Sequence, residues 1–522
     1  MIRTSETHPL QIDAMPVANG CLGLTLAPGK CCASAIGADW RRDMNADVAA
    51  IRRWGADMVV SLTTAPEMRM MGIADLGAAL KRQGIDWLPL GFADCHAPDA
   101  DWWTRWRLHA PRIHALLERG GRVVIHCRAG LERTATVAAL ILVERGAALP
   151  EALERIATAR TGAAPLPGQR AALSRHAPAL QGRAARIRAS LLGGAIGDAT
   201  GAEIEFWTLD RIRRRFGGDQ LSALPHDGRL GSITDDTQMT LFTAEGLIRA
   251  GRRALERGIC DPASVVHHAL LRWYVTQGET PRMPVDLRHG LILDPRLSVR
   301  RAPGLTCLSG LGSATRFGDA ARNDSKGCGT IMRMAPVAFL GGSDPHALAI
   351  KCSALTHGHP TAGAAAAAFV DILMALDAGV PIEEAGRAAL ARSRGETARA
   401  LGQALRAPRD RRPETVESLG GGWTAEEALA IAFHAALVAE DFAQGIRIAV
   451  CHSGDSDSTG AIAGNILGLM YPDQVCRHPL ADKIECADHI AWIAEDLARF
   501  SAYAEGPAKV PGEDLDPIYP GF

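Results

Sequence analysis

The sequence lacks the marks of several large protein classes. Its 12 cysteines are scattered without a repeated Cys-x-x-Cys pattern, which argues against a disulfide framework or a structural zinc and for a reduced compartment. Lys and Arg number 57 against 58 Asp and Glu, so the net charge is -1 and no strong field indicates bulk nucleic acid or a membrane as a partner. Partners must therefore be inferred from individual sites.

Targeting and membrane signals are also missing. The start, MIRTSETHPLQID, has neither the basic nor the apolar region of a signal peptide, and the most apolar stretch, Ala362–Met374, is interrupted at Asp371. We therefore expect a cytoplasmic protein with no membrane partner. The length of 522 residues exceeds one ordinary domain. Roughly two to four domains are expected from such a length.

Up to residue 182, short apolar runs alternate with helical periodicity. This alternation predicts an α/β domain with a mainly parallel sheet, residues 1–182. Gly55 and Gly146 are expected to end two of its helices. The expected strands are Asp57–Thr63, Asp86–Phe92 and Arg122–His126, and the expected helices are Asp43–Trp54, Ile73–Gln83, Trp102–Arg119, Leu131–Arg145 and Pro150–Ala159.

Beyond the Pro-, Gly- and Arg-rich passage Pro165–Arg186, the alternation of strands disappears. Alanine-rich amphipathic periodicity replaces it, as in Ala263–Val275, Ala362–Asp377 and Ala425–Ala439. This periodicity predicts an all-α domain over residues 183–504. The last segment, 505–522, carries 4 prolines and few apolar anchors, so we expect an extended tail.

A cysteine at the end of an apolar strand forms the first candidate site. Residues 123–134, VVIHCRAGLERT, place Cys127 between this strand and the start of a helix. Backbone N–H groups of the loop and the positive end of the helix dipole favour a thiolate and a bound phosphate there. Arg133 can hold two phosphate oxygens in a bidentate fork, which makes Cys127 the nucleophile. The loop that binds the phosphate consists of Arg128, Ala129, Gly130, Leu131 and Glu132.

The strand, the His before Cys127, the central Gly130 and the Thr after Arg133 together resemble the signature of the cysteine-dependent protein phosphatases. Residues 1–182 look most like the dual-specificity branch, near the cyclin-dependent kinase-associated phosphatase. The resemblance implies that Cys127 attacks phosphorus, that Arg133 binds the phosphoryl group and that Thr134 assists departure of the thiolate. No cofactor is expected in this domain.

Such chemistry also needs a general acid on a mobile loop upstream. Asp94 matches the acid position of the resembled family, whereas Asp99 precedes a helix and fits an N-cap better. One departure is Glu132, where close relatives often carry glycine, because a carboxylate aimed at the bound phosphate would repel it. The domain is therefore either a phosphatase or a phosphate-binding module without turnover.

Two acidic clusters, far apart in the sequence, form the second candidate site. The first is Thr234-Asp235-Asp236, and the second is Asp455-Ser456-Asp457-Ser458. Hard oxygen ligands without clustered cysteine or histidine favour Mg²⁺ or Mn²⁺ over zinc or copper. The alternative interpretation treats each cluster as an ordinary capping signal at a helix start.

Glycine recurs every fourth residue in two helical segments, 193–201 and 460–468. Glycine inside a helix costs about 1 kcal/mol relative to alanine, so another helix must approach closely at each segment. We expect these two helices to pack together. Their packing would bring Asp198 or Glu205 near Asp455.

Five motifs in this order resemble the ADP-ribosylglycohydrolase family, which includes the dinitrogenase reductase-activating glycohydrolase. They are GDATG at 197, TDDTQM at 234, GCGTIMR at 327, LTHGH at 355 and GDSDS at 454. The resemblance implies an all-α fold with two Mg²⁺ or Mn²⁺ ions. Ser458 stands where the family usually has threonine and keeps the hydroxyl oxygen. The metal ligands implied are Thr234, Asp235, Asp236, Asp455, Asp457 and Ser458.

The same resemblance suggests residues that contact the substrate. Glu205 matches an acidic residue near the metals that contacts substrate or positions water, and Asp198 is a further candidate. Gly327 and Gly329 can expose backbone N–H groups to a diphosphate, and His357 is expected in the ribose or metal pocket or as a buried structural histidine. A proton of the attacking water could be taken by Asp235, Asp236 or Glu205.

Together the two sites predict a bifunctional hydrolase. One half would remove ADP-ribose from a modified protein or small-molecule conjugate, and the other would remove phosphate from a phosphoprotein or related phosphoester. In the alternatives, the N-terminal half is a phosphate-binding module that targets the glycohydrolase, or the second half is an ADP-ribose sensor. Arginine, serine and small-molecule conjugates share the same ribose and diphosphate, so all remain candidate substrates.

Overall fold

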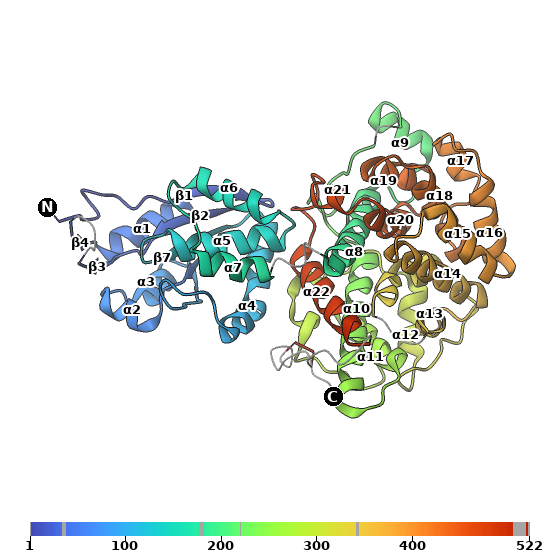
Figure 1. The fold of residues 1–522 in the computed structure, drawn as a ribbon, viewed down its shortest axis with the longest axis horizontal. Helices are drawn as coiled ribbons and strands as arrows, with labels where there is room; N and C mark the ends of the chain where they lie inside the picture. The colour runs from blue at the N-terminus through green and yellow to red at the C-terminus, as the bar shows by residue number, and fades with distance from the viewer. Residues whose placement is uncertain are drawn as a thin grey trace. The chain divides into compact units, whose positions relative to one another are not determined.

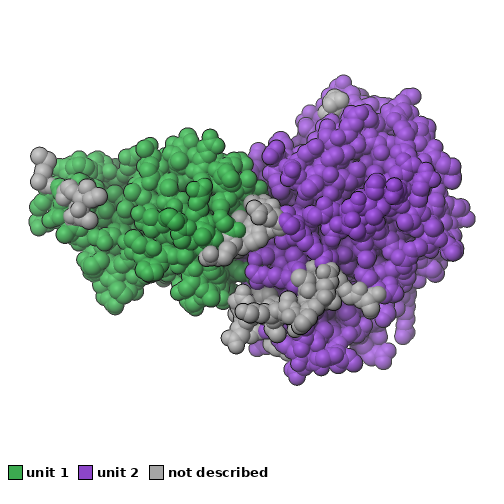
Figure 2. Space-filling model, viewed as in Figure 1, with its two compact units in different colours: residues 1–178 green, residues 179–522 purple. Residues whose placement is uncertain are grey.

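The computed structural model describes residues 2–33, 38–176, 182–219, 221–340, 344–504 and 518–519. The chain divides into two compact units, residues 1–178 and 179–522, which Figure 2 shows in different colours. Unit 1 combines strands and helices, whereas unit 2 is helical (Figure 1). The Pro-, Gly- and Arg-rich passage 165–186 contains the last helix of unit 1, Pro167–His176, and the start of a long helix at Gly182.

A five-stranded mixed sheet forms the centre of unit 1. Its strands are β1 (Asp13–Val17), β2 (Gly20–Leu26), β5 (Met58–Ser61), β6 (Asp86–Pro89) and β7 (Arg122–Cys127). Their order is β1-β2-β7-β5-β6. β1 and β2 pair antiparallel, and the other neighbours pair parallel. Two short strands, β3 (Cys31–Cys32) and β4 (Trp40–Arg41), pair with each other outside this sheet.

Helices of unit 1 pack against this sheet (Figure 1). Side chains of the first three helices share a hydrophobic core with Val59 of β5 and Val124 of β7. Since successive strand residues point to opposite faces, the buried Val123 and Ile125 fill the other side. The sheet is therefore buried on both faces. The helices are α1 (Met44–Trp54), α2 (Ala65–Met70), α3 (Leu76–Arg82), α4 (Ala100–Glu118), α5 (Glu132–Glu144), α6 (Leu149–Ala159) and α7 (Pro167–His176).

The helices α1, α3, α4, α5 and α6 lie near their predicted positions, and Gly55 ends α1 in the left-handed conformation. The helices α2 and α7 are absent from the prediction. The strands β1 and β2, however, are absent from the prediction, and their antiparallel pairing makes the sheet mixed. β2 contains glycine, which is a weak strand former. A Cβ at Gly23 would lie 2.6 Å from Ile12 and 2.9 Å from Trp54, so packing requires this glycine.

Unit 2 is built from helices, as the sequence predicts. Within 182–219, 221–340 and 344–504 there is no β-strand, only isolated bridges such as Gly327 with Thr424. Its α-helices are α8 (Gly182–Gly201), α9 (Leu209–Phe216), α10 (Asp235–Arg257), α11 (Pro262–Thr276), α12 (Leu305–Ser313), α13 (Pro345–Ala354), α14 (Pro360–Asp377), α15 (Ile382–Arg392), α16 (Gly395–Arg406), α17 (Pro413–Glu417), α18 (Ala425–Val438), α19 (Phe442–Val450), α20 (Ser456–Met470), α21 (Pro472–Cys476) and α22 (Ala487–Ala504). Its 3₁₀ helices are η2 (Ala202–Ile204), η3 (Gly290–Leu293), η4 (Pro295–Leu297), η5 (Cys328–Arg333) and η6 (Ala335–Ala338).

The glycine segments bring α8 and α20 into backbone contact, which confirms the predicted helix pair (Figure 1). A Cβ added at Gly197 would overlap the carbonyl oxygen of Gly460. A Cβ at Gly201 would overlap the backbone of Ser456, the first residue of α20. The end of α8 and the start of α20 are therefore fixed against each other, at the second acidic cluster.

One described helix, α14, is long and apolar enough to cross a membrane, with mean hydropathy 1.3 over 18 residues. In the structure 67% of this window is buried inside the unit. Such burial is typical of a core helix.

The predicted extended tail, residues 505–522, lies outside the described residues except for Ile518 and Tyr519. Tyr519 is only 4% exposed, and Ile518 packs against the core of unit 2. These two residues are therefore anchored on unit 2 rather than solvated.

Candidate active sites

In unit 1, the loop after β7 folds around the sulfur of Cys127. The backbone N–H of Gly130 donates to Cys127 Sγ at 3.2 Å. Gly130 has a φ of 74°, and a Cβ there would overlap the backbone of Thr25 in β2, so the turn requires glycine. Helix α5 begins two residues later at Glu132, and its first N–H groups therefore lie at this loop. This is the geometry of an anion-binding loop.

Basic side chains hold the outer side of this loop. Arg160 Nε donates to the carbonyl of Gly130 at 2.7 Å, and Lys30 Nζ donates to the carbonyl of Arg128 at 3.1 Å. Lys30 also lies over the ring of Trp40, with its Nζ 4.5 Å from the ring centroid. Burial lowers the pKa of Lys30 to about 8. Of the remaining loop residues, Ala129 is exposed and Leu131 is half-buried.

Arg133 is completely buried and held by several acceptors. Its Nη1 donates to the carbonyls of Leu62 at 3.0 Å and Phe92 at 2.8 Å. The Glu67 carboxylate accepts from Nη1 at 2.9 Å and from Nη2 at 2.8 Å. Nε is buried and has no partner among the described residues, which leaves one donor available to an anion.

Glu67 is a site residue that sequence reasoning missed. Its side chain also accepts from the backbone N–H of Thr64 at 2.7 Å and completes a capping box at the start of α2. The Thr-x-x-Glu spacing signals this cap in the sequence. Nothing in that spacing points to Arg133, which lies 66 residues further along the chain.

The structure separates the two candidate acids of this site. Asp94 Oδ1 lies 3.0 Å from Arg133 Nη2, and its side chain is 39% exposed. Asp99 instead accepts from the backbone N–H of Trp102 at 2.8 Å and is the N-cap of α4. Thr134 is buried, and its Oγ1 has no partner among the described residues. Of these two candidate acids, Asp94 is therefore the one that lies beside Arg133.

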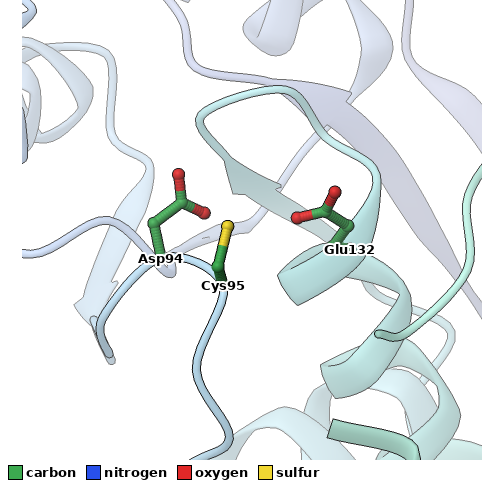
Figure 3. A group of neighbouring side chains, drawn as sticks. All are labelled: Asp94, Cys95 and Glu132. Carbon is green, nitrogen blue, oxygen red and sulfur yellow. The ribbon is translucent and has the colours of Figure 1, made fainter. Parts of the chain in front are cut away.

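Glu132 points toward the loop of Asp94. Figure 3 shows its carboxylate facing Asp94 and Cys95, and the ligand atoms of all three lie within 4.8 Å of one another. The negative charge of Glu132 therefore stands beside the entrance to the anion-binding loop. Such a charge opposes the approach of phosphate.

A buried hydrogen-bonded chain supports the strand that carries Cys127. Trp87 Nε1 donates to Ser61 Oγ at 2.8 Å, and Ser61 Oγ lies 2.7 Å from His126 Nε2. Burial lowers the pKa of His126 to about 4, so this histidine is neutral at physiological pH. His126 therefore fixes the position of its neighbour without adding charge.

In unit 2, carboxylates from separate segments meet. Oxygens of Glu205, Asp455 and Asp457 lie within 4.8 Å of one another. Glu205 directly follows η2, whereas Asp455 is the N-cap of α20. Ser458 N–H donates to Asp457 Oδ1 at 2.9 Å and to Asp455 Oδ1 at 3.3 Å. The structure thus confirms the expected approach of Glu205 to Asp455.

The start of α10 supplies the other acidic residues. Thr234 is its N-cap, and Asp235 accepts from the backbone N–H of Gly304 at 3.1 Å. Ser458 Oγ lies 3.3 Å from Asp236 Oδ1 and so links this helix to α20. The two acidic motifs therefore form one cluster. Thr234 and Asp455 also cap α10 and α20, so the alternative interpretation of the motifs as capping signals holds for these two residues as well.

Asp198, expected as a possible substrate contact, lies buried behind the first turn of α10. Its carboxylate accepts from the backbone N–H groups of Thr234 at 3.1 Å and Thr237 at 3.2 Å, and it is fully buried. Asp198 therefore fixes the first turn of α10, which carries Asp235 and Asp236.

Crowding perturbs every carboxyl group of the cluster. Burial and the neighbouring charges raise the pKa of Asp235, Asp236 and Asp457 well above the ordinary value. Burial, followed by the charge of Asp457, raises the pKa of Glu205 to about 9, and burial raises the pKa of Asp455 to about 6. A cation that neutralises the cluster would remove this cost.

The donor set of the cluster fits a divalent cation. Asp236 is 2% exposed, and its Oδ2 has no hydrogen-bond partner among the described residues. Carboxylate and hydroxyl oxygens are the ligands that Mg²⁺ and Mn²⁺ prefer.

The glycine motif of η5 lies against a histidine. A Cβ at Gly327 would be 3.3 Å from His357 Nε2, and one at Gly329 would be 3.4 Å from His357 Cε1. His357 is 2% exposed, and its Nδ1 lies 2.8 Å from Thr356 Oγ1. Burial lowers the pKa of His357 to about 3. Its surroundings are those of a neutral structural histidine that supports the glycine motif.

Cys328 is a second residue that sequence reasoning missed. Its Sγ lies 2.7 Å from Asp455 Oδ2 and 3.7 Å from Ser458 Oγ. Burial and the charge of Asp455 raise the pKa of this thiol well above the ordinary value. The signal in the sequence is its place between two glycines of one of the family's motifs.

An exposed aromatic pair borders the same cluster. Phe206 follows Glu205 and stacks on Trp423, with ring centroids 5.1 Å apart and an interplanar angle of 24°. Phe206 is 71% exposed and Trp423 is 43% exposed. Phe206 also has a left-handed backbone with a φ of 66°, which is rare for a bulky residue and typical of functional sites.

The helical unit with its buried acidic cluster matches a known protein family. The model of the ADP-ribosylglycohydrolase family matches residues 179–505, more than half of the chain. The chain belongs to the ADP-ribosylglycohydrolase family.

Among curated proteins, the chain is 25% identical over 313 residues to the ADP-ribosylarginine hydrolase Tri1 of Pseudomonas putida (strain GB-1), covering 60% of this chain and 77% of that protein. It is 26% identical over 299 residues to the ADP-ribosyl-dinitrogen reductase glycohydrolase of Rhodospirillum rubrum, covering 55% of this chain and 85% of that protein.

The N-terminal region resembles a solved phosphatase structure. A kinase-associated phosphatase, with serine in place of its catalytic cysteine, covers 32% of this chain and 92% of its own, with 22% identity and a TM-score of 0.28.

Proposed function

We propose that unit 2 is a metal-dependent hydrolase that releases ADP-ribose from a modified target. The observation that carries this proposal is the convergence of Glu205, Asp455 and Asp457 within 4.8 Å, in a chain of this family. The relatives named above act on ADP-ribosylarginine and on ADP-ribosylated dinitrogen reductase. Arginine-linked ADP-ribose is therefore the substrate we propose first.

The proposed metal centre takes two Mg²⁺ or Mn²⁺ ions. When bound, the ions orient the ribose hydroxyls and stabilise the charge that develops on oxygen. The residues that would hold them are Thr234, Asp235, Asp236, Asp455, Asp457 and Ser458.

Glu205 is the residue that we assign to proton transfer. Asp235 accepts a hydrogen bond from Gly304 and Asp457 accepts one from Ser458, whereas no described residue donates to the Glu205 carboxylate. Once cations neutralise the cluster, the raised pKa of Glu205 falls, and its carboxylate can take a proton from the water that attacks the anomeric carbon. The bond from the anomeric carbon to the nitrogen of the modified side chain breaks, the oxygen of the water takes its place, and the leaving nitrogen takes up the proton from Glu205. Phe206 and Trp423 offer a flat apolar surface to the substrate next to this carboxylate.

The test is release of free ADP-ribose from ADP-ribosylated arginine and serine substrates by the intact protein. We expect release from the arginine substrate with Mg²⁺ or Mn²⁺, none with chelator, and loss of about 1000-fold or more in Asp457→Ala. The exposed Asp473 on α21 provides a matched control, Asp473→Ala, which should retain activity. Release that persists in chelator would overturn the metal centre. Retention of bound ADP-ribose without any release would instead identify a sensor.

We further propose that unit 1 hydrolyses phosphoesters through Cys127. In this mechanism, the Cys127 thiolate forms a bond to phosphorus while the bond to the leaving oxygen breaks, and Asp94 donates a proton to that oxygen. Arg133 and the loop N–H groups hold the phosphoryl oxygens. Water, deprotonated by Asp94, then attacks phosphorus, and the hydroxyl of Thr134 donates to the departing sulfur.

Hydrolysis of an aryl phosphate tests this second activity. We expect activity in the intact protein and loss in Cys127→Ser, while Cys21→Ser, a change in β2, leaves the rate unchanged. Glu132 beside the entrance favours the other candidate function, a phosphate-binding module. Retained phosphopeptide binding without turnover in the intact protein would identify that module.

A further inference from the structure

A thiol lies inside the acidic cluster of unit 2, where carboxylates and hydroxyls predominate. Cys328 Sγ is 2.7 Å from Asp455 Oδ2 and 3.7 Å from Ser458 Oγ. Its backbone is fixed as well, since Cys328 N–H donates to the carbonyl of Trp423 at 3.1 Å. The sulfur therefore contacts one carboxylate oxygen of Asp455, Oδ2, while Ser458 N–H donates to the other, Oδ1.

Contacts connect this sulfur to the other side of the cluster. Ser458 Oγ lies 3.7 Å from the sulfur and 3.3 Å from Asp236 Oδ1. The second oxygen of Asp236 is buried and has no hydrogen-bond partner among the described residues. A buried carboxylate oxygen without a donor requires a cation or a water. A chain of contacts thus runs from Asp455 through Cys328 and Ser458 to Asp236, whose second oxygen lacks a positive partner.

We propose that Cys328 is a ligand of a divalent cation bound between Asp455 and Asp236, which gives this position a mixed oxygen and sulfur donor set. The inference rests on the proposed metal centre and goes beyond it. Oxygen ligands alone select Mg²⁺ or Mn²⁺, whereas a thiolate selects softer cations of the zinc class, including Zn²⁺, Cd²⁺ and Co²⁺. On binding, the S–H bond breaks, a bond from sulfur to the cation forms and the proton goes to solvent.

Metal-stripped full-length protein, titrated with Co²⁺ and followed by absorption, provides the test. A cobalt–thiolate bond produces a charge-transfer band that oxygen ligands do not give. We expect this band in the native protein and in Cys352→Ser, which replaces another buried cysteine of unit 2. We expect the part of this band that comes from unit 2 to be absent from the spectrum of Cys328→Ser. In Asp455→Asn we expect the band to be weaker than in the native protein.

Binding affinities supply a second readout, independent of activity. Cys328→Ser keeps an oxygen at this position, so we expect Cd²⁺ affinity to fall about 10-fold or more while Mn²⁺ affinity changes less than about threefold. Circular dichroism of each variant shows whether the fold is retained, and Cys328→Ala provides a second variant if the serine does not fold.

The outcomes separate the inference from the function on which it rests. A band of equal intensity in Cys328→Ser, or Mn²⁺ binding with no band in the native protein, would overturn the role of Cys328 alone. Failure of the native protein to bind either Mn²⁺ or Co²⁺ in unit 2 would overturn the metal centre itself.

Discussion

The two candidate sites differ in how the chain assembles them. In unit 1, nine consecutive positions, 126–134, carry the proposed nucleophile Cys127, the anion-binding loop and Arg133. In unit 2, the cluster joins Glu205, the start of α10 and the start of α20, and Ser458 lies 222 residues from Asp236. A contiguous site depends on the local path of the backbone, whereas a dispersed site depends on how helices pack.

The sites also differ in charge. Arg133, Lys30 and the N-terminus of α5 surround the loop of unit 1 with positive charge, which suits an anionic ligand. The cluster of unit 2 concentrates buried carboxylates, and burial together with their mutual repulsion raises the pKa of Asp235 and Asp236. Basic groups therefore border the first site, whereas acidic groups crowd the second.

Among the variants that compare the two sites, the largest effect is expected on the contiguous site of unit 1. Arg133→Lys should lower kcat/KM for an aryl phosphate about 100- to 1000-fold, because lysine can neither keep the paired contacts with Glu67 nor offer the Nε–H that is left for the anion. ADP-ribose release by unit 2 should not change. The half-buried Arg128 provides the matched control, Arg128→Lys, which conserves the charge of the same loop and should lose little. Equal losses in both reactions would mean that the two sites are not independent.

The dispersed site should respond to a change distant from any ligand. Gly197→Ala adds a methyl group where α8 meets the carbonyl of Gly460, and overpacking of this kind costs about 1–3 kcal/mol. We expect a lower unfolding midpoint for unit 2 and weaker Mn²⁺ binding, measured by thermal melting and calorimetry. Gly168→Ala in α7 is the control, since nothing lies within 4 Å of its added Cβ. Unchanged Mn²⁺ binding in Gly197→Ala would show that helix spacing does not set the ligand positions.

A pH-dependent effect is expected under the phosphate-binding loop. Burial lowers the pKa of Lys30 from 10.5 to about 8, so the folded state holds this proton less tightly than the unfolded chain. The stability of the native protein relative to Lys30→Met should therefore rise between about pH 8 and pH 10, by on the order of 1 kcal/mol. Urea unfolding at several pH values measures this difference, and Lys81→Met, at an exposed position, serves as the control. A difference that falls over this range would contradict the burial of the charge.

The smallest expected effect is a gain. Glu132→Gln removes one negative charge from the entrance of the phosphate-binding loop, and a repulsion of about 1 kcal/mol corresponds to about a fivefold rise in kcat/KM. The rise should shrink at high salt, because ions screen the charge. Glu151→Gln on α6 is the control at an exposed position. A fall in kcat/KM in Glu132→Gln would show that the Glu132 carboxylate assists the reaction of unit 1 instead of opposing it.

The contiguous site was the easier one to predict from the sequence. The strand Arg122–His126 and the helix from Leu131 lie within one or two residues of β7 and α5, so Cys127 and Arg133 fall where local pattern places them. Glu67, by contrast, reaches Arg133 only through tertiary packing. Tertiary packing also explains why β2 was missed. Glycine is needed at position 23 because the ring of Trp54 packs against it, although glycine is a weak strand former.

In unit 2, the sequence predicted the helix pair because glycine repeated at the helical period is a signal of close approach. The position of Asp198 could not be predicted, since the same motif residue can face a substrate or a backbone. Its carboxylate accepts from the N–H groups of Thr234 and Thr237 and belongs to the support of α10. Cys328 could not be predicted either, because its contact with Asp455 spans 127 residues.

The fixed arginine of unit 1 has a consequence for turnover. Arg133 is already held by Glu67, Leu62 and Phe92, so its rotamer entropy, about 2 kcal/mol for a free arginine side chain, is lost on folding and not on ligand binding. Any tetrahedral oxyanion that reaches the loop gains from this order. If unit 1 hydrolyses phosphoesters as proposed, inorganic phosphate, the product, should therefore compete with the substrate and slow the reaction before the substrate is exhausted.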